Sequence, residues 1–419
     1  MRDPRLQTAL ILQEIIEQHL FSKEAKNSYG TYCDTDLAFI NMLLQTTLRH
    51  LVYIKKILKN FIKKKLPSSS KLGNYILHLA VAEILYMNTP DYAVINSYVN
   101  IAKKELNKYI AGFINAVLRK VCSNKEIFAK EDVGEFFPQE FRRLLNNSYN
   151  KKTIKLIEQS AIKEPYLDIT TKENFAIPQA VNLPLGSLRI KNNGNISQIT
   201  GYFEGKWWVQ DFSSSLPVKL LGNIKGLNVL DLCAAPGGKT AQLLSAGAKV
   251  TVLDISAPRL ETLKENLSRL NLSAQKIICA DAISWLQKYD GEDFDIILLD
   301  APCSATGTLR RHPELVHIKN LSDVIKMAEI QKNILSLAAK KIKKGGLLVY
   351  CTCSLATEEG EKQIAAFLQQ HTDYKTVHTK LPPQITELTT PEGWIRILPS
   401  HLSQFGGADG FFIALLTKE

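Results

Sequence analysis

The sequence predicts a multidomain protein with an N-terminal all-α bundle, a small α+β connector and a C-terminal α/β domain built on a doubly wound parallel sheet. Over the first 125 residues, apolar side chains recur at helical spacing. Short strand-like pieces separated by Asn and Gly turns follow in residues 161–225. After residue 226, apolar runs of strand length alternate with helical or loop segments, which is typical of a doubly wound sheet. A chain of 419 residues with 45% hydrophobic content can bury more than one core.

Residues 1–125 are expected to fold as helix after helix. The helical spacing is clearest in "DLAFINMLLQTTLRHLVYIKKIL" and "YILHLAVAEILYM", and turns are expected at "LPSSSKLG" and "NTPDY". Residues 126–160 are polar and charged, with one further helix in "QEFRRLLNNSYN", and are expected to form a helical connector. In residues 161–225, the segments "YLDIT", "SLRIK", "ISQIT" and "KWWVQ" predict a small α+β subdomain.

Residues 226–419 contain the strands of the predicted parallel sheet. In chain order these are "GLNVLDLC", "KVTVLDIS", "KIICAD", "FDIILLDAP" and "GGLLVYCTCS", the last beginning after Gly345 and Gly346. Because parallel strands keep their carboxyl ends together, the residues that end these strands are expected to gather at one edge of the sheet.

The sequence also predicts a cellular compartment. No stretch of about 18 apolar residues occurs, so a membrane span is not expected. The segment "MRDPRLQTALILQEIIEQHL" places its apolar residues at helical spacing after Pro4, which indicates an amphipathic helix and not a secretory signal. We therefore expect a cytoplasmic protein, monomeric by default, whose seven cysteines are free thiols.

The chain is basic, with a net charge of +11 and a pI of about 9.1. Residues 1–150 contain 21 basic and 14 acidic residues, and the densest basic run is "IKKILKNFIKKK". Such a run is often a solvated helix face, but basic helical faces also attract phosphate backbones. The overall positive charge favours a nucleic-acid partner. The candidate contacts are Lys55, Lys56, Lys59, Lys63, Lys64, Lys65 and, in "FINAVLRK", Arg119.

A glycine-containing turn follows the first predicted strand, in "VLDLCAAPGGKT". Between a strand and a helix, such a turn lets the backbone approach a ligand closely. A phosphate-binding lysine loop would need a glycine five residues before Gly238, where this chain has Cys233, and the Gly-x-Gly-x-x-Gly dinucleotide fingerprint is absent. The remaining turn, Ala-Pro-Gly-Gly, suits a smaller, zwitterionic nucleoside.

Acidic residues end successive strands of the predicted sheet. Asp254 lies 23 residues after Asp231, an offset typical of an acid that binds both ribose hydroxyls, and Arg259 follows it in the next helix. Asp281 ends the third strand, where it can meet the edge of an adenine ring. Each acid alone would be an ordinary helix N-cap, whereas acids at successive strand ends favour a ligand crevice. S-adenosylmethionine, which combines adenine, ribose and an amino acid without phosphate, fits this crevice.

The fourth and fifth strands end near thiol groups. The segment "FDIILLDAPCSATGTLRRHPE" carries Asp300 and Cys303, and Cys353 follows fifty residues after Cys303. Methylating carbon 5 of cytosine requires a thiolate that adds to carbon 6, a base that removes the proton at carbon 5, and a carboxyl group beside nitrogen 3. One acid and one or two cysteines meet these needs. Methylation of an exocyclic amine needs no such nucleophile.

The other cysteines have simpler interpretations. Free cysteines are commonly buried and inert, which is the expectation for Cys33, Cys122, Cys279 and Cys351. Cys351 and Cys353 are poorly placed to form a disulfide within one strand. A zinc site would need a second Cys or His pair at matched spacing, so no metal is expected.

In their order and spacing, "DLCAAPGGKT", "DAPCSATGTLRRHPE" and "YCTCSL" resemble the motifs of the RNA cytosine-5 methyltransferases of the Sun/Nop2 family. The segment "KWWVQDFSSSLPVKLL" is similar to the one ahead of the family's first strand, and "FFIALL" is similar to its closing strand. The resemblance covers residues 226–419. The N-terminal helices, with "INAVLRK" and "TPDYAVINSYVNIAKK", resemble a NusB-type RNA-binding bundle.

The resemblance implies a Rossmann-like, S-adenosylmethionine-dependent domain that makes 5-methylcytosine in RNA, with small-subunit (16S) ribosomal RNA as the leading substrate. It implies that Cys353 is the nucleophile, that Cys303 helps the adduct break down, and that Asp300 contacts the cytosine near the cofactor. The residues that it implies for cofactor binding are Cys233, Ala234, Ala235, Pro236, Gly237, Gly238, Lys239, Asp254, Arg259, Asp281 and Asp300.

Two alternatives remain open at the level of sequence. One is a methyltransferase of the same chemistry that acts on transfer RNA. The other is a non-catalytic RNA-binding or antitermination factor, against which the presence of both Cys303 and Cys353 argues. The sequence also departs from the family in "EPYLDITTK", where Asp168 stands near the arginine of the family's Arg-Val-Asn strand. This departure puts one RNA contact in question.

Overall fold

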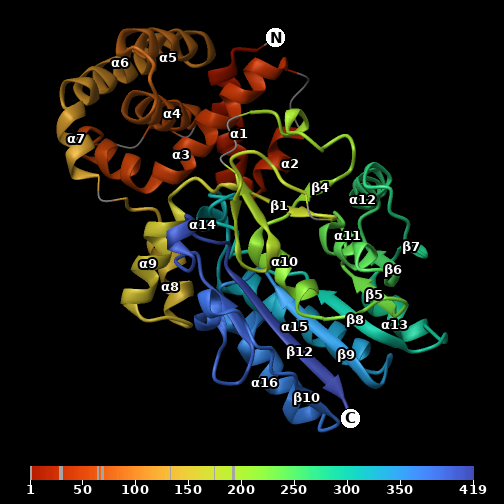
Figure 1. Ribbon diagram of the computed structural model, residues 1–419. Helices are drawn as coiled ribbons and strands as arrows, with labels where there is room; N and C mark the ends of the chain where they lie inside the picture. Colours follow the sequence, from red (N-terminus) through yellow and green to blue (C-terminus); the bar gives the residue numbers. More distant parts are fainter. Residues whose placement is uncertain are drawn as a thin grey trace. The chain divides into compact units, whose positions relative to one another are not determined.

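The computed structural model describes residues 2–27, 32–63, 66–67, 70–132, 134–173, 175–190 and 194–419. The chain divides into two compact units (Figure 1). The first comprises Met1–Arg143 and Arg311–Lys319, and the second comprises Leu144–Arg310 and Asn320–Glu419. The four segments expected from the sequence remain a proposal about how the chain is organised. Within the described ranges, no helix is both long and apolar enough to cross a membrane.

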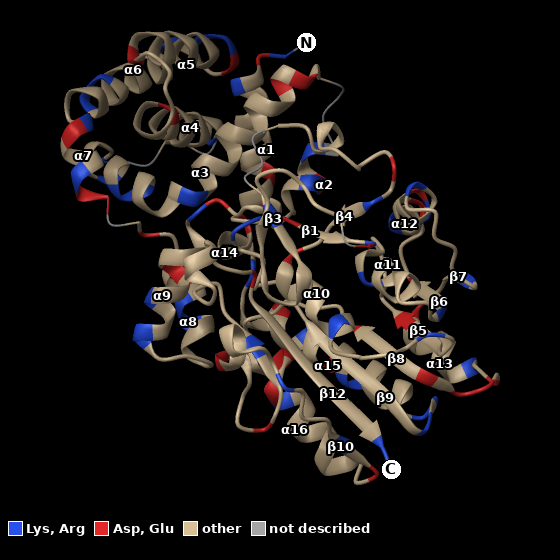
Figure 2. Cartoon of the chain, viewed as in Figure 1, with Lys and Arg blue, Asp and Glu red and all other residues tan. Residues whose placement is uncertain are grey.

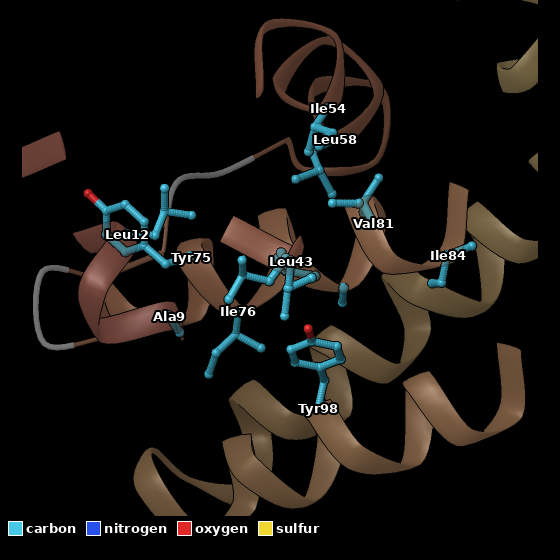
Figure 3. Close-up of a cluster of buried hydrophobic side chains, with 14 of the residues drawn as sticks. Ala9, Leu12, Leu43, Ile54, Leu58, Tyr75, Ile76, Val81, Ile84 and Tyr98 are labelled. Atoms are coloured by element: carbon cyan, nitrogen blue, oxygen red, sulfur yellow. The ribbon is translucent and has the colours of Figure 1, made fainter. Parts of the chain in front are cut away.

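The first unit is a helical bundle. Its helices are α1 (Pro4–Gln18), α2 (Ser22–Asn27), α3 (Asp34–Phe61), α4 (Leu72–Tyr86), α5 (Asp91–Glu105), α6 (Lys108–Ser123), α7 (Lys125–Glu131) and the short α14 (Leu315–Ile318). Helix α4 is apolar on all sides and is buried along most of its length, as expected for a helix at the centre of a bundle. Side chains of α1, α3 and α5 pack around it, among them Leu12, Leu43 and Tyr98 (Figure 3).

A buried carboxylate links three helices of this core. Glu83 of α4 is fully buried and accepts hydrogen bonds from Arg5 of α1, from Nε at 3.0 Å and from Nη2 at 2.6 Å. The hydroxyl of Tyr98 on α5 donates a third bond to the same carboxylate at 3.0 Å. Because a buried charge is costly unless it is paired and hydrogen-bonded, this network fixes α1 and α5 against α4.

Residues 311–319 leave the second unit and join the helical bundle. Ile318 belongs to the apolar core of the bundle. The backbone N–H of Ser22 donates to the Glu314 carboxylate at 3.2 Å, and His317 Nε2 lies 3.0 Å from the carbonyl oxygen of Leu48. The pattern of apolar residues did not predict that residues 311–319 join the helical bundle, because these contacts join residues almost three hundred positions apart.

The second unit contains a small antiparallel sheet. Helix α8 (Gln139–Asn146) begins in the first unit and ends in the second, and α9 (Lys151–Ala161) follows it. The sheet has the order β2-β3-β1-β4. Its strands are β1 (Leu167–Thr171), β2 (Val181–Asn182), β3 (Leu188–Ile190) and β4 (Trp207–Val209).

The larger sheet of the second unit has the order β10-β12-β9-β8-β5-β6-β7, with β11 paired to β12. Strands β5 to β9 pair parallel with one another, whereas β12 pairs antiparallel with β9, β10 and β11. Figure 1 shows β12, β9 and β8 side by side. The strands are β5 (Asn228–Leu232), β6 (Lys249–Asp254), β7 (Lys276–Cys279), β8 (Phe294–Asp300), β9 (Ile342–Thr352), β10 (Tyr374–Thr376), β11 (Ile395–Ile397) and β12 (Phe411–Lys418).

Helices connect the strands of the larger sheet. They are α10 (Phe212–Lys219), α11 (Gly238–Ser245), α12 (Ala257–Arg269), α13 (Ala282–Lys288), α15 (Leu321–Ala339) and α16 (Glu361–Gln370). Their apolar faces join two core clusters with the strands, which are buried as expected for a sheet covered on both faces. Strand β9 begins at Ile342, ahead of the glycine pair predicted to start it, because Ile342 pairs with Phe294 across an irregularity in the β8–β9 register.

Candidate active site

The carboxyl ends of the parallel strands align at one edge of the larger sheet. Leu232, the last residue of β5, pairs with Leu253 of β6 and with Leu299 of β8. At the next position, Asp254 pairs with Cys279 of β7, and Asp300 pairs with Cys351 of β9. The register therefore brings the acids and thiols named from the sequence to the same edge.

The turn between β5 and α11 has a tightly constrained backbone. Cys233 has φ 60° and Gly237 has φ 99°, both in the left-handed region, and the bond between Ala235 and Pro236 is cis. A Cβ atom at Gly237 would also lie 2.8 Å from the side chain of Leu263 on α12. This position consequently requires glycine, and α11 can begin at Gly238 directly behind the turn.

Asp254 is anchored to this turn. Its carboxylate is 2% exposed and accepts from the backbone N–H of Ala235 at 3.0 Å and of Ser256 at 2.9 Å. Arg259 Nη1 lies 4.0 Å from the same carboxylate, and Arg259 Nη2 donates to the carbonyl of Ala235. The acid, the arginine and the turn thus form one connected group.

Asp281 is more exposed and caps α13, because its carboxylate accepts from the backbone N–H of Ser284 at 2.8 Å. The helix-cap interpretation therefore applies to Asp281, although a carboxylate keeps further acceptor positions after one such bond. Ile255, which follows Asp254, is an apolar side chain with 69% exposure. An exposed apolar side chain directly after Asp254 is suited to the flat face of a purine.

Lys239 joins the turn to the end of β8. Its ammonium group lies 2.7 Å from Asp300 Oδ2 and 3.1 Å from Ser214 Oγ. Its side chain is 7% exposed, and the Asp300 side chain is 31% exposed. Burial lowers the pKa of Lys239, but the charge and hydrogen bond of Asp300 together with the nearby Cys351 and Cys353 outweigh burial, so this pKa lies above its usual value. Lys239 is therefore a fixed cation beside the two strand ends that carry Asp300 and the thiols.

Asp231 lies beneath the turn and is fully buried. Thr240 Oγ1 donates to its Oδ2 at 2.6 Å, and its Oδ1 has no hydrogen-bond partner among the described residues. Burial raises the pKa of Asp231 to about 7, with a smaller contribution from the charge of Asp300. In the sequence analysis, Asp231 served only to count the 23 residues to Asp254. Its raised pKa arises from its burial in the folded chain.

These groups fit S-adenosylmethionine better than a phosphate-bearing ligand. A phosphate would need a cation directed at the turn, but Lys239 is paired with Asp300, and Arg259 bonds the turn carbonyl beside Asp254. Carboxylates dominate this edge, and they suit the hydroxyls of a ribose and the positive charges of an ammonium and a sulfonium group. The residues that would hold the group are those of the turn from Cys233 to Lys239 with Asp254, Arg259, Asp281 and Asp300.

The two predicted thiols lie together. Cys303 Sγ and Cys353 Sγ are 3.4 Å apart, which is hydrogen-bond distance for sulfur and far longer than a disulfide, and all seven cysteines are free. The hydrogen bond with Cys353 and burial both raise the pKa of Cys303, so this thiol keeps its proton. Cys351 is buried, as predicted, and its thiol also donates to Asp300 Oδ1 at 3.5 Å. The same prediction is wrong for Cys33 and Cys279, which are exposed. The contact between Cys351 and Asp300 was not predicted from the sequence.

The candidate RNA-binding residues lie in the first unit. Lys55, Lys56 and Lys59 are on α3, and Arg119 is on α6, where its Nε donates to Asn115 at 3.2 Å. Lys56 lies 3.5 Å from Glu135. Lys63 follows α3, whereas Lys64 and Lys65 lie outside the described residues. Acidic residues also occur on α3, α5 and α7, which carry basic residues (Figure 2), and these candidates remain predictions.

The sequence also missed a buried carboxylate behind the thiols. Glu359 is fully buried and accepts from both the backbone and the side chain of Ser304, which follows Cys303. The acidic run that contains it, "TEEGE", is typical of a solvated helix start. A possible signal was its place six residues after Cys353, within reach of the strand end.

The doubly wound sheet, with a glycine-containing turn and several carboxylates at the carboxyl edge of its parallel strands, defines an S-adenosylmethionine-dependent methyltransferase. The comparisons with known proteins make this class more specific. Residues 219–417 match the family model described as 16S rRNA methyltransferase RsmB/F, and residues 2–123 match the NusB family.

Curated relatives cover nearly the whole chain. The ribosomal RNA small subunit methyltransferase B of Vibrio cholerae is 31% identical over 92% of this chain and 90% of its own length. The protein of the same name from Proteus mirabilis is 32% identical over 92% of this chain and 91% of its own length. The chain therefore belongs to the RsmB/F family of RNA methyltransferases and carries the family's NusB domain.

Solved structures support the fold. The crystal structure of PH0851 covers 100% of this chain and 99% of its own chain, with a TM-score of 0.75 and 23% identity. The structure of NSun6 from Pyrococcus horikoshii covers 68% of this chain and 99% of its own, with a TM-score of 0.58 and 20% identity. At these identities the likeness concerns the fold alone.

Proposed function

We propose that the protein methylates carbon 5 of a cytosine in small-subunit ribosomal RNA, with Cys353 as the nucleophile. The observation that carries the proposal is the pair of thiols, 3.4 Å apart, beside Asp300 at the cofactor edge of the sheet. The names of the full-length relatives support ribosomal RNA of the small subunit as the substrate. Bound S-adenosylmethionine supplies an electrophilic methyl group.

In the first step, the Cys353 thiol gives up its proton to solvent and its sulfur bonds to carbon 6 of the cytosine ring; the thiol takes a proton back when the sulfur leaves. The electron pair of the 5,6 double bond is then available at carbon 5, which becomes the nucleophile for methylation. The carboxyl group of Asp300 lies at the same strand ends and can carry a proton to ring nitrogen 3, where negative charge otherwise develops as sulfur adds, and it takes this proton back when sulfur leaves. Lys239 holds Asp300 in place through the 2.7 Å ion pair.

In the second step, the proton at carbon 5 leaves and the bond from sulfur to carbon 6 breaks, which restores the 5,6 double bond. Cys303 is the base for this proton. The pKa of Cys303 is raised chiefly by its hydrogen bond with Cys353, with further contributions from burial and the charge of Cys353. Once Cys353 is bonded to carbon 6, the contributions from Cys353 are lost, so Cys303 can release its own proton to solvent and accept the one from carbon 5. One proton is released overall.

The first test incubates the protein with labelled S-adenosylmethionine and small-subunit ribosomal RNA. We expect 5-methylcytidine from the wild type, no product from Cys353→Ala, and a protein–RNA adduct that survives denaturation from Cys303→Ala. Cys33→Ala, which removes an exposed thiol of the helical bundle, is the control and should retain activity. Product formation by Cys353→Ala would contradict the assignment of the nucleophile.

The substrate is tested separately, by offering transfer RNA, naked small-subunit ribosomal RNA and small subunits to the same wild-type protein. We expect label in the ribosomal RNA and very little in transfer RNA. Preferential labelling of transfer RNA would overturn the proposed substrate while leaving the chemistry intact. Absence of product with every RNA, from a folded protein that binds the cofactor, would favour the non-catalytic alternative.

A further inference from the structure

The chain segments that carry the two thiols are both bound by the carboxylate of Glu359. This residue ends a short 3-10 helix, Thr357–Glu359, and is fully buried. The backbone N–H of Ser304, the residue after Cys303, donates to Oε1 at 2.8 Å, and the Ser304 hydroxyl donates to Oε2. The hydroxyl of Ser354, the residue after Cys353, also donates to Oε2. One side chain therefore holds the position next to each thiol.

The positions before the thiols are tied to the same group. Gln331 of α15 donates from Nε2 to the Glu359 carboxylate at 3.0 Å and to the carbonyl of Pro302 at 2.8 Å. On the other strand, Thr352 Oγ1 donates to the backbone carbonyl of Glu359 at 3.1 Å. Cys303 and Cys353 are thus bracketed on both sides by residues bonded to Glu359 or to its partner Gln331.

The negative charge of Glu359 sets the direction of the hydrogen bonds in this cluster. A carboxylate only accepts, so the hydroxyls of Ser304 and Ser354 must both donate toward it. Ser354 Oγ is then free to accept from the backbone N–H of Ala356 at 3.0 Å. Thr306 Oγ1, which accepts from Leu355 N at 3.0 Å, completes the ring of hydroxyls at 3.2 Å from both serines. A neutral apolar side chain at position 359 would leave several buried donors without an acceptor.

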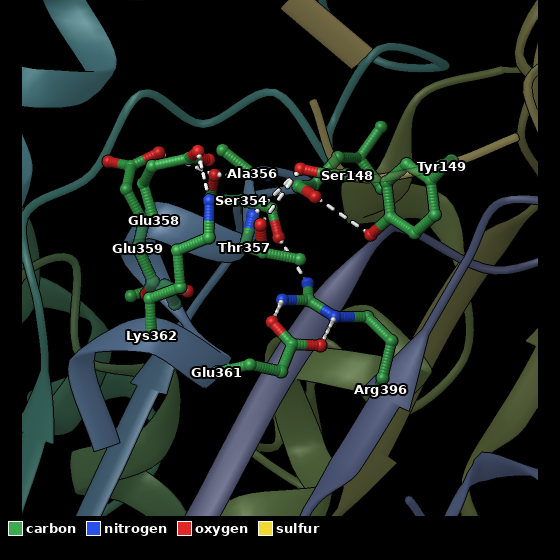
Figure 4. Close-up of polar contacts among 12 residues, drawn as sticks. Ser148, Tyr149, Ser354, Ala356, Thr357, Glu358, Glu359, Glu361, Lys362 and Arg396 are labelled. Carbon is green, nitrogen blue, oxygen red and sulfur yellow. Dashed lines mark hydrogen bonds and ion pairs between the residues drawn. The ribbon is translucent and has the colours of Figure 1, made fainter. Parts of the chain in front are cut away.

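The outer side of the segment after Cys353 is anchored independently of Glu359 (Figure 4). Arg396 donates to the carbonyl of Ser354 at 2.6 Å and pairs with Glu361, and Tyr149 donates to the carbonyl of Leu355 at 2.7 Å. These contacts fix the segment to the body of the second unit. They do not reach Cys303, so they cannot fix one thiol relative to the other.

We infer that Glu359 is a positioning residue that sets the spacing of Cys303 and Cys353 and so controls both attack on the pyrimidine and release of the product. The inference rests on the proposed function for its catalytic meaning. The spacing itself can be measured without RNA or cofactor. Glu359 touches neither the substrate nor the reacting atoms in this arrangement. It positions the thiols through Ser304 and Ser354, and its charge also raises the pKa of Cys303.

The first readout is chemical coupling of the two thiols in the full-length protein. Diamide removes one hydrogen from each of two thiols, forms a disulfide and is itself reduced to the hydrazine. The rate of the Cys303–Cys353 bond, followed by peptide mass mapping, therefore reports how often the sulfur atoms meet in the right geometry. We expect coupling in Glu359→Ala to be slower than in the wild type by about tenfold or more, because a displacement on the order of 1 Å degrades a reactive geometry strongly.

The second readout is steady-state methylation. We expect kcat of Glu359→Ala to fall by about 100-fold while KM for S-adenosylmethionine stays within about twofold, because the cofactor turn is untouched. Glu359→Gln keeps an oxygen for Ser304 N and Gln331 and places an amide where Oε2 stood, so both effects should be intermediate. Glu358→Gln is the matched control, because Glu358 pairs instead with Lys362 at 2.6 Å and should behave as wild type in both assays (Figure 4).

The outcomes separate this inference from the proposed function. Wild-type coupling rates in Glu359→Ala would overturn the positioning role, whatever the activity. If the wild type makes no 5-methylcytidine but coupling still slows in Glu359→Ala, the proposed function fails and the positioning role stands. If Glu359→Ala does not fold, Glu359→Gln decides, and wild-type values of its coupling rate and kcat would contradict the inference.

Discussion

At the scale of single residues, Asp168 and Arg189 form a buried, two-pronged ion pair in the small sheet. Arg189 donates from Nε at 2.6 Å and from Nη2 at 2.7 Å to the carboxylate, and the two side chains are 4% and 0% exposed. Asp168 also accepts from the backbone N–H of Phe212 at 3.0 Å. Arg189 Nη1 donates to the carbonyls of Phe405 and Gly407 at 2.8 and 2.6 Å. Asp168, the departure from the family pattern, therefore has a structural role and is not exposed to RNA.

We expect Arg189→Met to destabilise the second unit by about 3–5 kcal/mol, because it leaves the Asp168 carboxylate buried without its cation. The four tryptophans, Trp207, Trp208, Trp285 and Trp394, all lie in this unit, so their fluorescence in urea measures its unfolding. Lys264→Met, which breaks an exposed pair with Glu261, is the control and should leave the urea midpoint unchanged. Equal midpoints for the two variants would contradict the prediction.

At the scale of elements, the loop after β8 contacts two further segments, the one that carries Cys353 after β9 and the one that carries Gly410 before β12. Gly307 makes both contacts. Its N–H donates to the carbonyl of Cys353, and its carbonyl accepts from the N–H of Gly410, each at 2.8 Å. A Cβ atom at Gly307 would lie 2.0 Å from Gly410 O and 2.8 Å from Cys353 O, both backbone atoms that cannot move cheaply. The close approach of these three segments requires glycine at this position.

Gly307→Ala should therefore reduce methyltransferase activity by about 100-fold or more, because the loop must move away from the strand end that carries Cys353. Gly112→Ala on α6 is the matched substitution, since a Cβ atom there meets nothing within 4 Å. It should leave activity unchanged and raise helix stability by about 0.5–1 kcal/mol. Activity within twofold of wild type in Gly307→Ala would show that the loop can adjust.

At the scale of the whole molecule, the two units should respond differently to acid, because two buried histidines lie in the helical bundle. Burial lowers the pKa of His78 to about 3 and that of His317 to about 4, from a usual value of 6.5. His317 Nε2 donates to the carbonyl of Leu48, and Nδ1 of His78 has no hydrogen-bond partner among the described residues. Both rings are therefore neutral in the folded bundle at pH 5.

Below pH 6.5, the unfolded chain binds a proton at each of these histidines while the folded chain does not. The free energy of unfolding should therefore fall as the pH is lowered from 6.5 toward 4, by about 1.4 kcal/mol per pH unit for each histidine. Circular dichroism in urea reports the loss of helix in both units, and tryptophan fluorescence reports the unfolding of the second unit alone. The difference between the two curves therefore reports the unfolding of the helical bundle. In His317→Gln, the slope of the unfolding free energy against pH should fall by the contribution of one histidine. His19→Gln, a substitution at an exposed position, should leave the slope unchanged. A slope in His317→Gln equal to that of the wild type would be incompatible with a neutral His317.

The sequence determined the local elements and the chemical inventory of this protein. Helical spacing predicted the bundle, and the order of apolar runs predicted a parallel sheet with strands that end at Asp254, at Asp300 and just before Cys353, because period and strand length are properties of neighbouring residues. Parallel pairing then implied that these ends meet. The tightness of the turn at Gly237 also followed from local composition.

The tertiary structure alone decided distances and partners between segments far apart in the chain. It placed residues 311–319 in the helical bundle, paired Lys239 with Asp300, buried Asp168 against Arg189, and set the thiols 3.4 Å apart with Glu359 behind them. The sequence could not supply these facts, because they depend on strand register, loop path and side-chain packing. Register, loop path and packing can shift atoms by ångströms without any change in the pattern of apolar and polar residues. The proposed chemistry depends on shifts of about 1 Å between reacting atoms.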